Sequence, residues 1–433
     1  MNTTTLSTLK DAHGHTMSGA TRAAIDTFET ACHELRCYIG DPLAGAKAAL
    51  EQAPQMTMGH VLVAWLNLLG TEPAGFAEAR AALAAARALP AVNEREGMHL
   101  AAIEQLVQGR WHAAGLALED LNIRYPLDGL GLQAGHQVDF FTGNSRMLRD
   151  RIARALPDWQ PGMPGYHAVL GMHAFGLEET GDYAAAERVG RRSVELERRD
   201  GWGWHAVAHV FEMQNRRRDG IAWMKRDTDA WSEGSFFAVH NAWHLALFHL
   251  GLEEIDEVLA IVDERVLGGS SAVVIDMIDA SAMLWRLSLR GIAVGDRWSA
   301  LADRWAAVTQ AEEAGNYAFN DMHAMMAFMG AGRSREAARL IETQQRVLQQ
   351  GQGDNVMFLR DVGHDATRAV QAFAEGDAAE AVRLLRPLRS HAHRFGGSHA
   401  QRDIIDLTLI AAADKAGQQA LARALRHERT ARM

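Results

Sequence analysis

Apolar stretches that end near a glycine, short polar turns and alanine-rich stretches follow one another repeatedly along the chain. The pattern recurs in QLVQGRWHAAGLALEDL at Gly109, FGLEETGDYAAAERVGRRSVEL at Gly181, LFHLGLEEIDEVLAIVDERV at Gly251, AFMGAGRSREAARLIETQ at Gly332 and AFAEGDAAEAVRLLRPL at Gly376. Strong helix formers fill both kinds of stretch, and only 9 prolines interrupt them. The pattern predicts an all-α protein built from pairs of helices that are joined by tight turns.

The clearest copy of this unit is Gly181-Asp182-Tyr183 followed by Ala186. A glycine can supply the left-handed helix cap, the tyrosine can pack on the turn, and the small alanine lets two helices approach closely. These features are typical of tetratricopeptide hairpins, whose period is about 34 residues. Gly109, Gly143 and Gly181 are 34 and 38 residues apart, and later spacings are wider, so the repeats are degenerate. We expect a tetratricopeptide-like α-solenoid, a right-handed superhelix with the first helix of each pair on its inner face.

The length of 433 residues exceeds that of one ordinary compact core, which leaves several domains or one repeat array. No strong domain boundary is visible, and we expect a single α-solenoid over 1–433. The stretch LPDWQPGMPGYH is the richest in proline and glycine. A loop at 156–166 could therefore join an N-terminal segment, 1–155, to a C-terminal segment, 165–433.

Composition excludes some classes of function. The net charge of −10 and the pI near 6.1 argue against a nucleic-acid-binding surface, and the basic run 216–218 fits a solvated helix end. The most apolar stretch, 61–70, is too short to span a membrane, and the N-terminus lacks the apolar core of a signal peptide. Cys32 and Cys37 suit neither a disulfide framework nor a zinc knuckle nor a redox pair, so we interpret them as reduced thiols. A soluble cytoplasmic protein is expected.

Several strings are similar to the tetratricopeptide repeat protein 38 family. They include GWGWHAVAHVFEMQNRRRDGIAWM and HNAWHLALFHLG, together with EREGMHLAAIEQLVQGRW, VVIDMIDASAMLWRL, NDMHAMMAFMGAGR and GGSHAQRDIIDLTLI. The resemblance runs in unbroken order from about residue 10 to about residue 425. It implies an α-helical repeat protein. It implies little about chemistry, because a fold does not fix a function.

Two histidine pairs interrupt apolar helices at helical spacing. In the helix expected over 204–213, His205, His209 and Glu212 lie within an arc of roughly 60°. His240 and His244 form a second pair about one repeat later. Equivalent positions on successive first helices of a superhelix lie side by side, so the two pairs could face each other.

Further ionisable or polar residues lie at equivalent places in neighbouring repeats. A buried ionisable group needs a partner or loses its charge, so their recurrence predicts one shared polar cavity. Trp204 and Trp243 either wall this cavity or pack between helices. The candidate ligand-binding residues are His136, Trp204, Trp243, Asp276, Asp279, Asn320, Arg360, Asp361, Gln401, Arg402 and Asp403.

Two kinds of chemistry fit this set. A divalent metal could bind His205, His209, His240 and His244, with a carboxylate completing the sphere, although no named metal motif is present. Without a metal, histidines beside carboxylates can act as acids or bases, and Arg360 or Arg402 can clamp an anion. If the protein is an enzyme, a hydrolase or lyase is expected. The candidate catalytic residues are His205, His209, Glu212, His240, His244, Asp321 and His323.

Two functions remain open at this stage. In the first, the internal cavity binds a small polar or anionic molecule and acts on it. In the second, the protein is a scaffold that holds a peptide on its concave face, as many tetratricopeptide proteins do. The first is favoured because histidine and aspartate, rather than lysine, interrupt the apolar helices. Partners are then a small molecule or a peptide, without nucleic acid or membrane, and a homo-oligomer stays open.

Overall fold

The computed structural model describes residues 9–90, 92–311 and 314–431, and helices account for most of them. In these ranges the only β-type pairings are two isolated bridges, Lys10 with Thr16 and Ile39 with Ser235. The prediction of an all-α protein is confirmed. None of the helices within the same ranges has the length and apolar character that crossing a bilayer requires.

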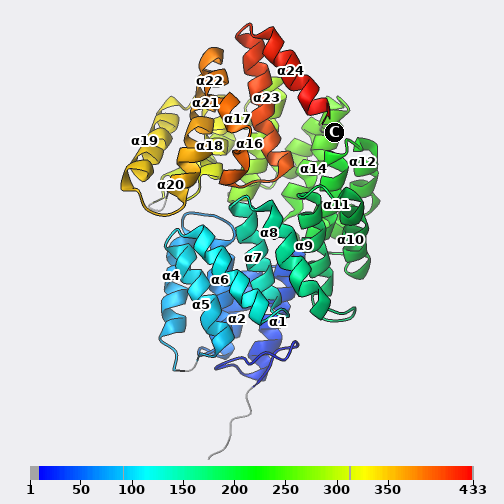
Figure 1. Ribbon diagram of the computed structural model, residues 1–433, viewed down its shortest axis with the longest axis vertical. Helices are drawn as coiled ribbons and strands as arrows, with labels where there is room; N and C mark the ends of the chain where they lie inside the picture. The colour runs from blue at the N-terminus through cyan, green and yellow to red at the C-terminus, as the bar shows by residue number, and fades with distance from the viewer. Residues whose placement is uncertain (1–8, 91, 312–313, 432–433) are drawn as a thin grey trace, which may run out of the picture.

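Most helices form antiparallel pairs that follow one another in space (Figure 1). The pairs are α1 (Arg22–Cys37) with α2 (Pro42–Gln52), α3 (Thr57–Leu68) with α4 (Gly75–Arg87), α5 (Glu94–Val107) with α6 (Trp111–Arg124), α7 (Gly129–Phe141) with α8 (Ser145–Ala155), α9 (Tyr166–Glu178) with α10 (Tyr183–Leu196), α11 (Gly201–Met213) with α12 (Arg217–Arg226), α14 (Ala238–Gly251) with α15 (Ile255–Ile261), α16 (Val274–Leu289) with α17 (Arg297–Thr309), α18 (Ala318–Gly330) with α19 (Ser334–Gln350), α21 (His364–Ala374) with α22 (Ala378–Leu388), and α23 (His399–Lys415) with α24 (Gln419–Ala431). Short helices α13 (Thr228–Ser232) and α20 (Asn355–Phe358) lie between pairs. The protein is thus a tetratricopeptide-like α-solenoid with degenerate repeats.

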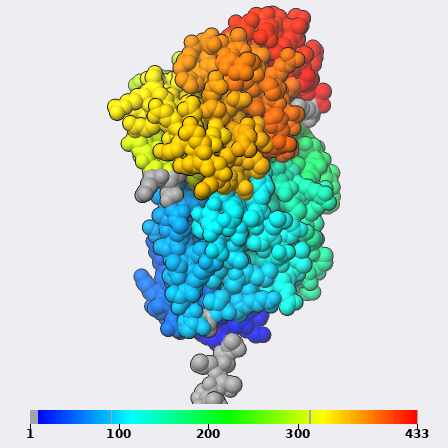
Figure 2. All heavy atoms as spheres, turned by 60° about the vertical axis from the view of Figure 1, so that its left-hand side comes forward, coloured from blue at the N-terminus to red at the C-terminus, as the bar shows by residue number. Residues whose placement is uncertain are grey.

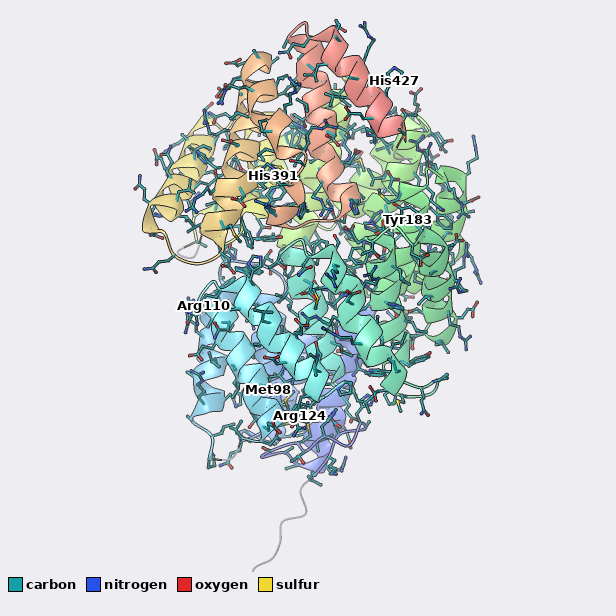
Figure 3. All side chains as sticks on the ribbon, viewed as in Figure 1. Met98, Arg110, Arg124, Tyr183, His391 and His427 are labelled. Carbon is teal, nitrogen blue, oxygen red and sulfur yellow. The ribbon has the colours of Figure 1, made fainter. Side chains whose placement is uncertain are left out.

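The turn between α9 and α10 has the expected construction. Gly181 has a φ of +86°, in the left-handed region that glycine enters without strain. Asp182 then caps α10 by accepting a hydrogen bond from the backbone N–H of Ala185. Tyr183 packs at the edge of an apolar cluster that contains Ala186, and it lies near the right-hand side of Figure 3.

The turn at Gly251 differs from this prediction. Gly251 stays in the last turn of α14, and the left-handed residue is Glu253, with a φ of 64°. The missing side chain of Gly251 instead lets Arg217 approach the backbone closely, because a Cβ at this position would lie 2.0 Å from Nε of Arg217. The guanidinium of Arg217 donates to the carbonyl of Gly251 at 2.8 Å, which ties α12 to the end of α14.

The first helices of the central pairs form the interior. Nearly every residue of α9, α11, α14, α16 and α18 is buried, whereas α10, α12, α17 and α19 expose one face. Polar side chains on the central first helices are therefore surrounded by protein on all sides. The hydrogen bonds and the charge state of any histidine or carboxylate there therefore depend on the residues packed directly around it.

Later helices of the solenoid pack back onto earlier ones. Helix α23 packs against both α16 and α11, and Arg286 of α16 donates to the carbonyl of Ala400 in α23 at 2.8 Å. The C-terminal helices also rest on the N-terminal ones on the face drawn in Figure 2. Between these two parts of the chain, Asp354 donates its backbone N–H to the carbonyl of Gly109, and the buried Tyr317 hydroxyl donates to the carbonyl of Phe141.

The loop predicted as a boundary leads directly from α8 to α9. It begins with the short 3-10 helix Leu156–Asp158, and the buried Trp159 then donates its indole N–H to the carbonyl of Pro126. Helices α8 and α9 pack against each other across this loop. A division into segments 1–155 and 165–433 stays a prediction.

Candidate functional site

The two histidine pairs meet between neighbouring first helices. His205 and His209 lie on α11, and His240 and His244 lie on α14, which packs beside it. Nε2 of His205 is 3.0 Å from Nε2 of His240, and one nitrogen from each of the four rings lies within 4.8 Å of the others. We call these four residues the histidine cluster. Their side-by-side placement is the one that the repeat pattern predicts.

Few of the ring nitrogens in the histidine cluster have a hydrogen-bond partner. Nδ1 of His240 donates to the carboxylate of Asp279 at 2.8 Å, which leaves its Nε2 to accept from His205. Nδ1 of His205 and both nitrogens of His209 and His244 are buried without any hydrogen bond from the described residues. Buried polar atoms are almost always satisfied by protein or by ordered water, so these nitrogens are available to a partner other than the described protein atoms.

Burial also fixes the charge of these rings. It lowers the pKa of His205 and His244 well below the usual value, and the neighbouring imidazoles lower it further. Burial lowers the pKa of His209 to about 3. These three imidazoles are therefore neutral at pH 7, which is the form that binds a metal ion.

Aromatic rings enclose the histidine cluster. Trp202 lies 4.6 Å from the His205 ring and Trp243 is stacked 5.5 Å from the His240 ring. Phe175 of α9 lies 5.3 Å from the His205 ring. Trp204 points elsewhere: it packs 4.3 Å from Trp223, and its indole N–H donates to the carbonyl of Arg198. Trp243 thus walls the cluster, whereas Trp204 packs between α11 and α12.

His205 and His240 face an internal cavity of about 300 Å³. Its walls are mainly apolar, from Leu35, Tyr38, Leu66, Leu69, Phe140, Phe141, Trp202, Phe236, Phe237, Val273, Ile275, Ile278, Tyr317 and Phe319. Polar groups come from Thr71, Glu72, Gln133, Gln137, Asn320, Ser398 and Gln401, and no arginine or lysine of the described residues belongs to the lining. The cavity therefore suits a small, mostly apolar molecule with a few hydrogen-bonding groups rather than an anion.

A buried glutamate lies on the other side of the cluster. Oε2 of Glu178, at the end of α9, is 3.5 Å from Nδ1 of His209, and neither carboxyl oxygen of Glu178 has a hydrogen bond. Burial raises the pKa of Glu178 well above its usual value, and the charge of Glu179 raises it further. Both effects favour the protonated form of the Glu178 carboxyl group, which contacts the histidine cluster.

The next residue, Glu179, is ionised and leads towards a second cavity. Burial raises its pKa, but His399 and Arg402 outweigh that effect and hold the pKa at about 2. Nδ1 of His399 lies 3.0 Å from Oε2 of Glu179, and this carboxylate raises the pKa of His399. His209, Glu178, Glu179 and His399 therefore form a row of titratable groups from the cluster outwards.

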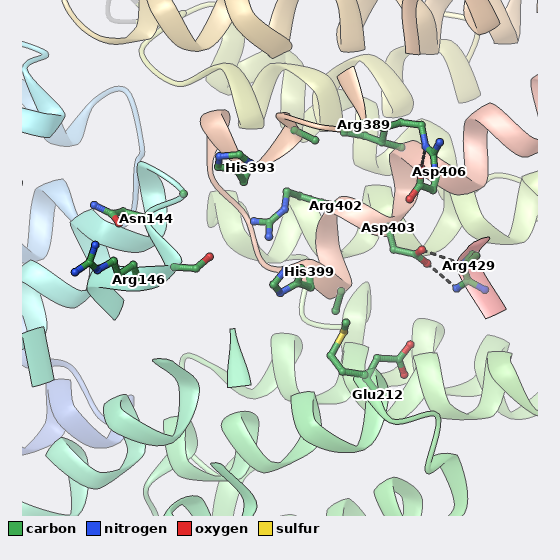
Figure 4. A pocket seen from close by; sticks show the side chains of 16 residues that line it. Asn144, Arg146, Glu212, Arg389, His393, His399, Arg402, Asp403, Asp406 and Arg429 are labelled. Atoms are coloured by element: carbon green, nitrogen blue, oxygen red, sulfur yellow. Dashed lines mark hydrogen bonds and ion pairs between the residues drawn. The ribbon is translucent and has the colours of Figure 1, made fainter. Parts of the chain in front are cut away.

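The second cavity measures about 590 Å³ and is drawn in Figure 4. His399, Arg402 and Asp403 line it from α23, and Glu212 lines it from α11. Asp403 forms a two-pronged ion pair with Arg429 at 2.7 Å and 2.9 Å. The single chamber expected from the sequence is thus divided: His205 and His240 face one cavity, and Glu212, Arg402 and Asp403 face another.

The remaining candidates are dispersed. Asp276, whose pKa burial raises to about 6, lies one turn before Asp279 on α16, and His136 lies 5.7 Å from the Trp202 ring beside the cluster. Asn320 and Gln401 line the first cavity, where Asn320 donates to Thr71 and Gln401 forms a capping box with Ser398.

Four candidates lie away from both cavities. Asp321 accepts a hydrogen bond from Gln344, and Nδ1 of His323 is bound to the carbonyl of Phe319. Arg360 is exposed, and Asp361 pairs with Arg394 at 2.9 Å. Neither Arg360 nor Asp361 lines either cavity, so neither is placed to clamp a molecule bound there.

Sequence reasoning missed Glu178, Glu179 and His399. A signal was present, because the two glutamates end an otherwise apolar stretch, AVLGMHAFGLEE, where solvated charges are unexpected. His399 gave no signal, since only the return of α23 onto α11 brings it near α9.

Comparisons with known proteins add little to this description. No family model matches the sequence. Among solved structures, the chain is similar to the crystal structure of the P58(IPK) TPR domain, with 15% identity over 92% of this chain and 99% of that one, at a TM-score of 0.21. A likeness of this size carries no argument about function, and the tetratricopeptide-like character of the chain rests on its own helical hairpins.

Proposed function

We propose that the histidine cluster binds a divalent transition-metal ion and that the 300 Å³ cavity beside it holds a small, mainly apolar molecule for binding or reaction. The observation that carries the proposal is the convergence of buried imidazole nitrogens that have no hydrogen-bond partner. Imidazole is a preferred ligand of zinc, copper, iron and nickel. We also propose that the protein is cytoplasmic and that it belongs to the tetratricopeptide repeat protein 38 family, which its sequence resembles.

The distances are compatible with such an ion. Imidazole nitrogens bind zinc at about 2.0–2.1 Å, which places two ligand atoms of a regular tetrahedron about 3.3 Å apart. The 3.0 Å between the Nε2 atoms of His205 and His240 is close to this edge. Asp279 would act as the outer partner, because its hydrogen bond fixes the tautomer and orientation of His240.

The chain's own groups divide the remaining work. A bound divalent ion supplies Lewis-acid polarisation, which suits hydrolysis or elimination. Trp202, Phe175 and Trp243 exclude water, and Gln133 and Asn320 offer hydrogen bonds that orient a molecule in the cavity. Glu178 holds a proton beside His209, and the row through Glu179 and His399 leads towards the second cavity.

Zinc titration of the full chain after chelator treatment tests the proposal. His205→Gln and the double variant His209→Gln/His244→Gln should each bind one equivalent of zinc fewer than the wild type, measured by calorimetry and elemental analysis. His136→Gln is the matched control, because His136 is equally buried but lies outside the cluster. Equal zinc binding by the wild type and both cluster variants, or the same loss in His136→Gln, would refute it.

A protein-interaction scaffold is the second candidate. The observation in its favour is the helical-repeat architecture itself, which commonly presents a concave surface to a peptide. By fold class alone, a scaffold is the better-supported function. Native mass spectrometry of the purified chain separates the two: a co-purifying peptide that stays bound in the double variant supports the scaffold, and a metal lost in that variant supports the histidine cluster.

A further inference from the structure

A second group of metal-ligand side chains comes from α1 and α9. His33 and Cys37 are four residues apart on the last turn of α1, and His167 lies on the first turn of α9. The Cys37 sulfur is 3.9 Å from each nitrogen of His33. One ligand atom from each of the three residues lies within 4.8 Å of the other two.

The hydrogen bonds around His167 fix which of its nitrogens is free. Nδ1 lies 2.8 Å from Oδ2 of Asp200, and the same oxygen accepts a hydrogen bond from the Ser193 hydroxyl at 2.7 Å. Oδ1 of Asp200 accepts the backbone N–H of Gly203, since Asp200 is the N-cap of α11. An acceptor held in this way requires Nδ1 of His167 to be the donor, so its Nε2 carries a lone pair.

That lone pair has no partner. The His167 side chain is only 10% exposed, and its Nε2 is buried without a hydrogen bond from any described residue. The carboxylate–imidazole pair of Asp200 and His167 is the arrangement that commonly orients a metal-ligating histidine. Nε2 of His167 is therefore a second observation, independent of the thiol, that points to a bound cation.

His33 and His167 also line a cavity of about 370 Å³ that is separate from the other two. His13, His15, Asp11 and Glu197 contribute further polar groups to its wall. A cation held by three protein ligands here would border this cavity through His33 and His167, and tetrahedral coordination would leave one position for a further ligand. Open positions of that kind distinguish zinc sites that bind an exogenous ligand from purely structural ones.

We propose that His33, Cys37 and His167 form a separate site for zinc or a similar thiophilic divalent cation. One thiolate and two imidazoles are a ligand set that favours zinc over magnesium or calcium. Because the thiolate is the ligand, binding releases the thiol proton of Cys37 to solvent while the Cys37 sulfur bonds to the ion. The site does not depend on the function proposed for the histidine cluster, which contains no sulfur.

Cobalt(II) titration of the full chain, treated first with a chelator and a reductant, is the decisive experiment. A thiolate ligand gives cobalt(II) a near-ultraviolet charge-transfer band that imidazole ligands cannot produce. The wild type should develop this band to one equivalent, and Cys37→Ser should lose it. Cys32→Ser is the matched control, because Cys32 is also a buried free thiol on α1 but is not one of the three ligands.

Two further variants keep the test decisive if Cys37→Ser does not fold. His33→Asn changes a half-buried residue and should weaken the band in a helical protein. Asp200→Asn keeps the helix cap and should lower the cobalt affinity by about 10–100-fold, as loss of an outer partner does. No band in the wild type, or a band that survives Cys37→Ser or disappears in Cys32→Ser, overturns the proposal.

Discussion

Acid should destabilise the protein through His136, and the structure sets the size of the effect. His136 lies on α7 and is only 1% exposed. Burial, followed by the charge of Arg151, lowers its pKa from 6.5 to about 3. The unfolded chain therefore binds a proton at this residue in a pH range where the folded protein does not.

The sign and magnitude follow from linkage. With a lowered folded pKa, His136 imposes no penalty above pH 6.5, and stability is lost as the pH falls from 6.5 towards 3. At pH 5 the shortfall is about 1.5 pKa units, which corresponds to about 2 kcal/mol of unfolding free energy. The full difference of about 3.5 units, or ~5 kcal/mol, would be reached only below pH 3.

Urea unfolding of the wild type and His136→Gln at pH 8 and pH 5, with chelator present, measures this effect. Glutamine cannot take up the proton, so the stability of the wild type relative to the variant should fall by about 2 kcal/mol between the two pH values. His427→Gln, on the exposed surface of α24 (Figure 3), is the control and should follow the wild type at both. A wild-type-to-variant difference that is the same at pH 8 and pH 5 would show that His136 is not buried in neutral form.

Three further outcomes are expected. Burial raises the Asp321 pKa from 3.8 to about 7, so the wild type loses unfolding free energy as the pH rises through that range. The stability of Asp321→Asn relative to the wild type should therefore increase by about 4 kcal/mol between pH 4 and pH 8 in urea unfolding. A difference that does not change with pH would contradict the shift. Glu179→Gln should cost about 3 kcal/mol or more by removing the partner of His399 and Arg402. Glu178→Gln should cost much less, because burial raises the Glu178 pKa and so favours the uncharged carboxyl, and equal losses would contradict this direction. Trp204→Ala should lower stability by about 3–5 kcal/mol without changing the zinc stoichiometry, and a change in that stoichiometry would place Trp204 at the site.

The histidine cluster could be predicted because two periodicities act together in it. The spacing of four puts His205 with His209, and His240 with His244, on single helix faces. The repeat then places α11 beside α14, so the two faces meet. Both pieces of information are local, each lying within a window of about one repeat.

Glu212 shows the limit of this reasoning. Its position within the same arc as His205 and His209 predicted a shared site, but Glu212 lies in the last turn of α11 and lines the second cavity near Asp403. Burial raises the pKa of Glu212, and the charge of Asp403 raises it further. No local sequence pattern reveals that Asp403 lies near Glu212. The return of α23 onto α11 creates that cavity, and it depends on the curvature accumulated over the repeats between them.

The hydrogen bonding of the second ring nitrogen separates structural histidines from those proposed to bind a ligand. The sequence alone does not reveal that hydrogen bonding. His99 and His167 each bond to the N-cap aspartate of the following first helix, Asp128 and Asp200, and His240 bonds to Asp279 within α16. In His99 the other nitrogen accepts the indole N–H of Trp65 at 3.1 Å, so the ring is fully satisfied and ties three helices together.

In His167 the other nitrogen has no partner, and in His240 it meets only another imidazole. The histidine–aspartate contact thus recurs at positions that are not equivalent in the repeat, and the hydrogen bonding of the second ring nitrogen distinguishes the three histidines. A His99→Gln variant should accordingly lose stability while both the zinc stoichiometry and the cobalt charge-transfer band stay unchanged. Loss of either signal in that variant would mean that the histidine–aspartate contacts act together as one unit, and that the second nitrogen is not what distinguishes the candidate ligands.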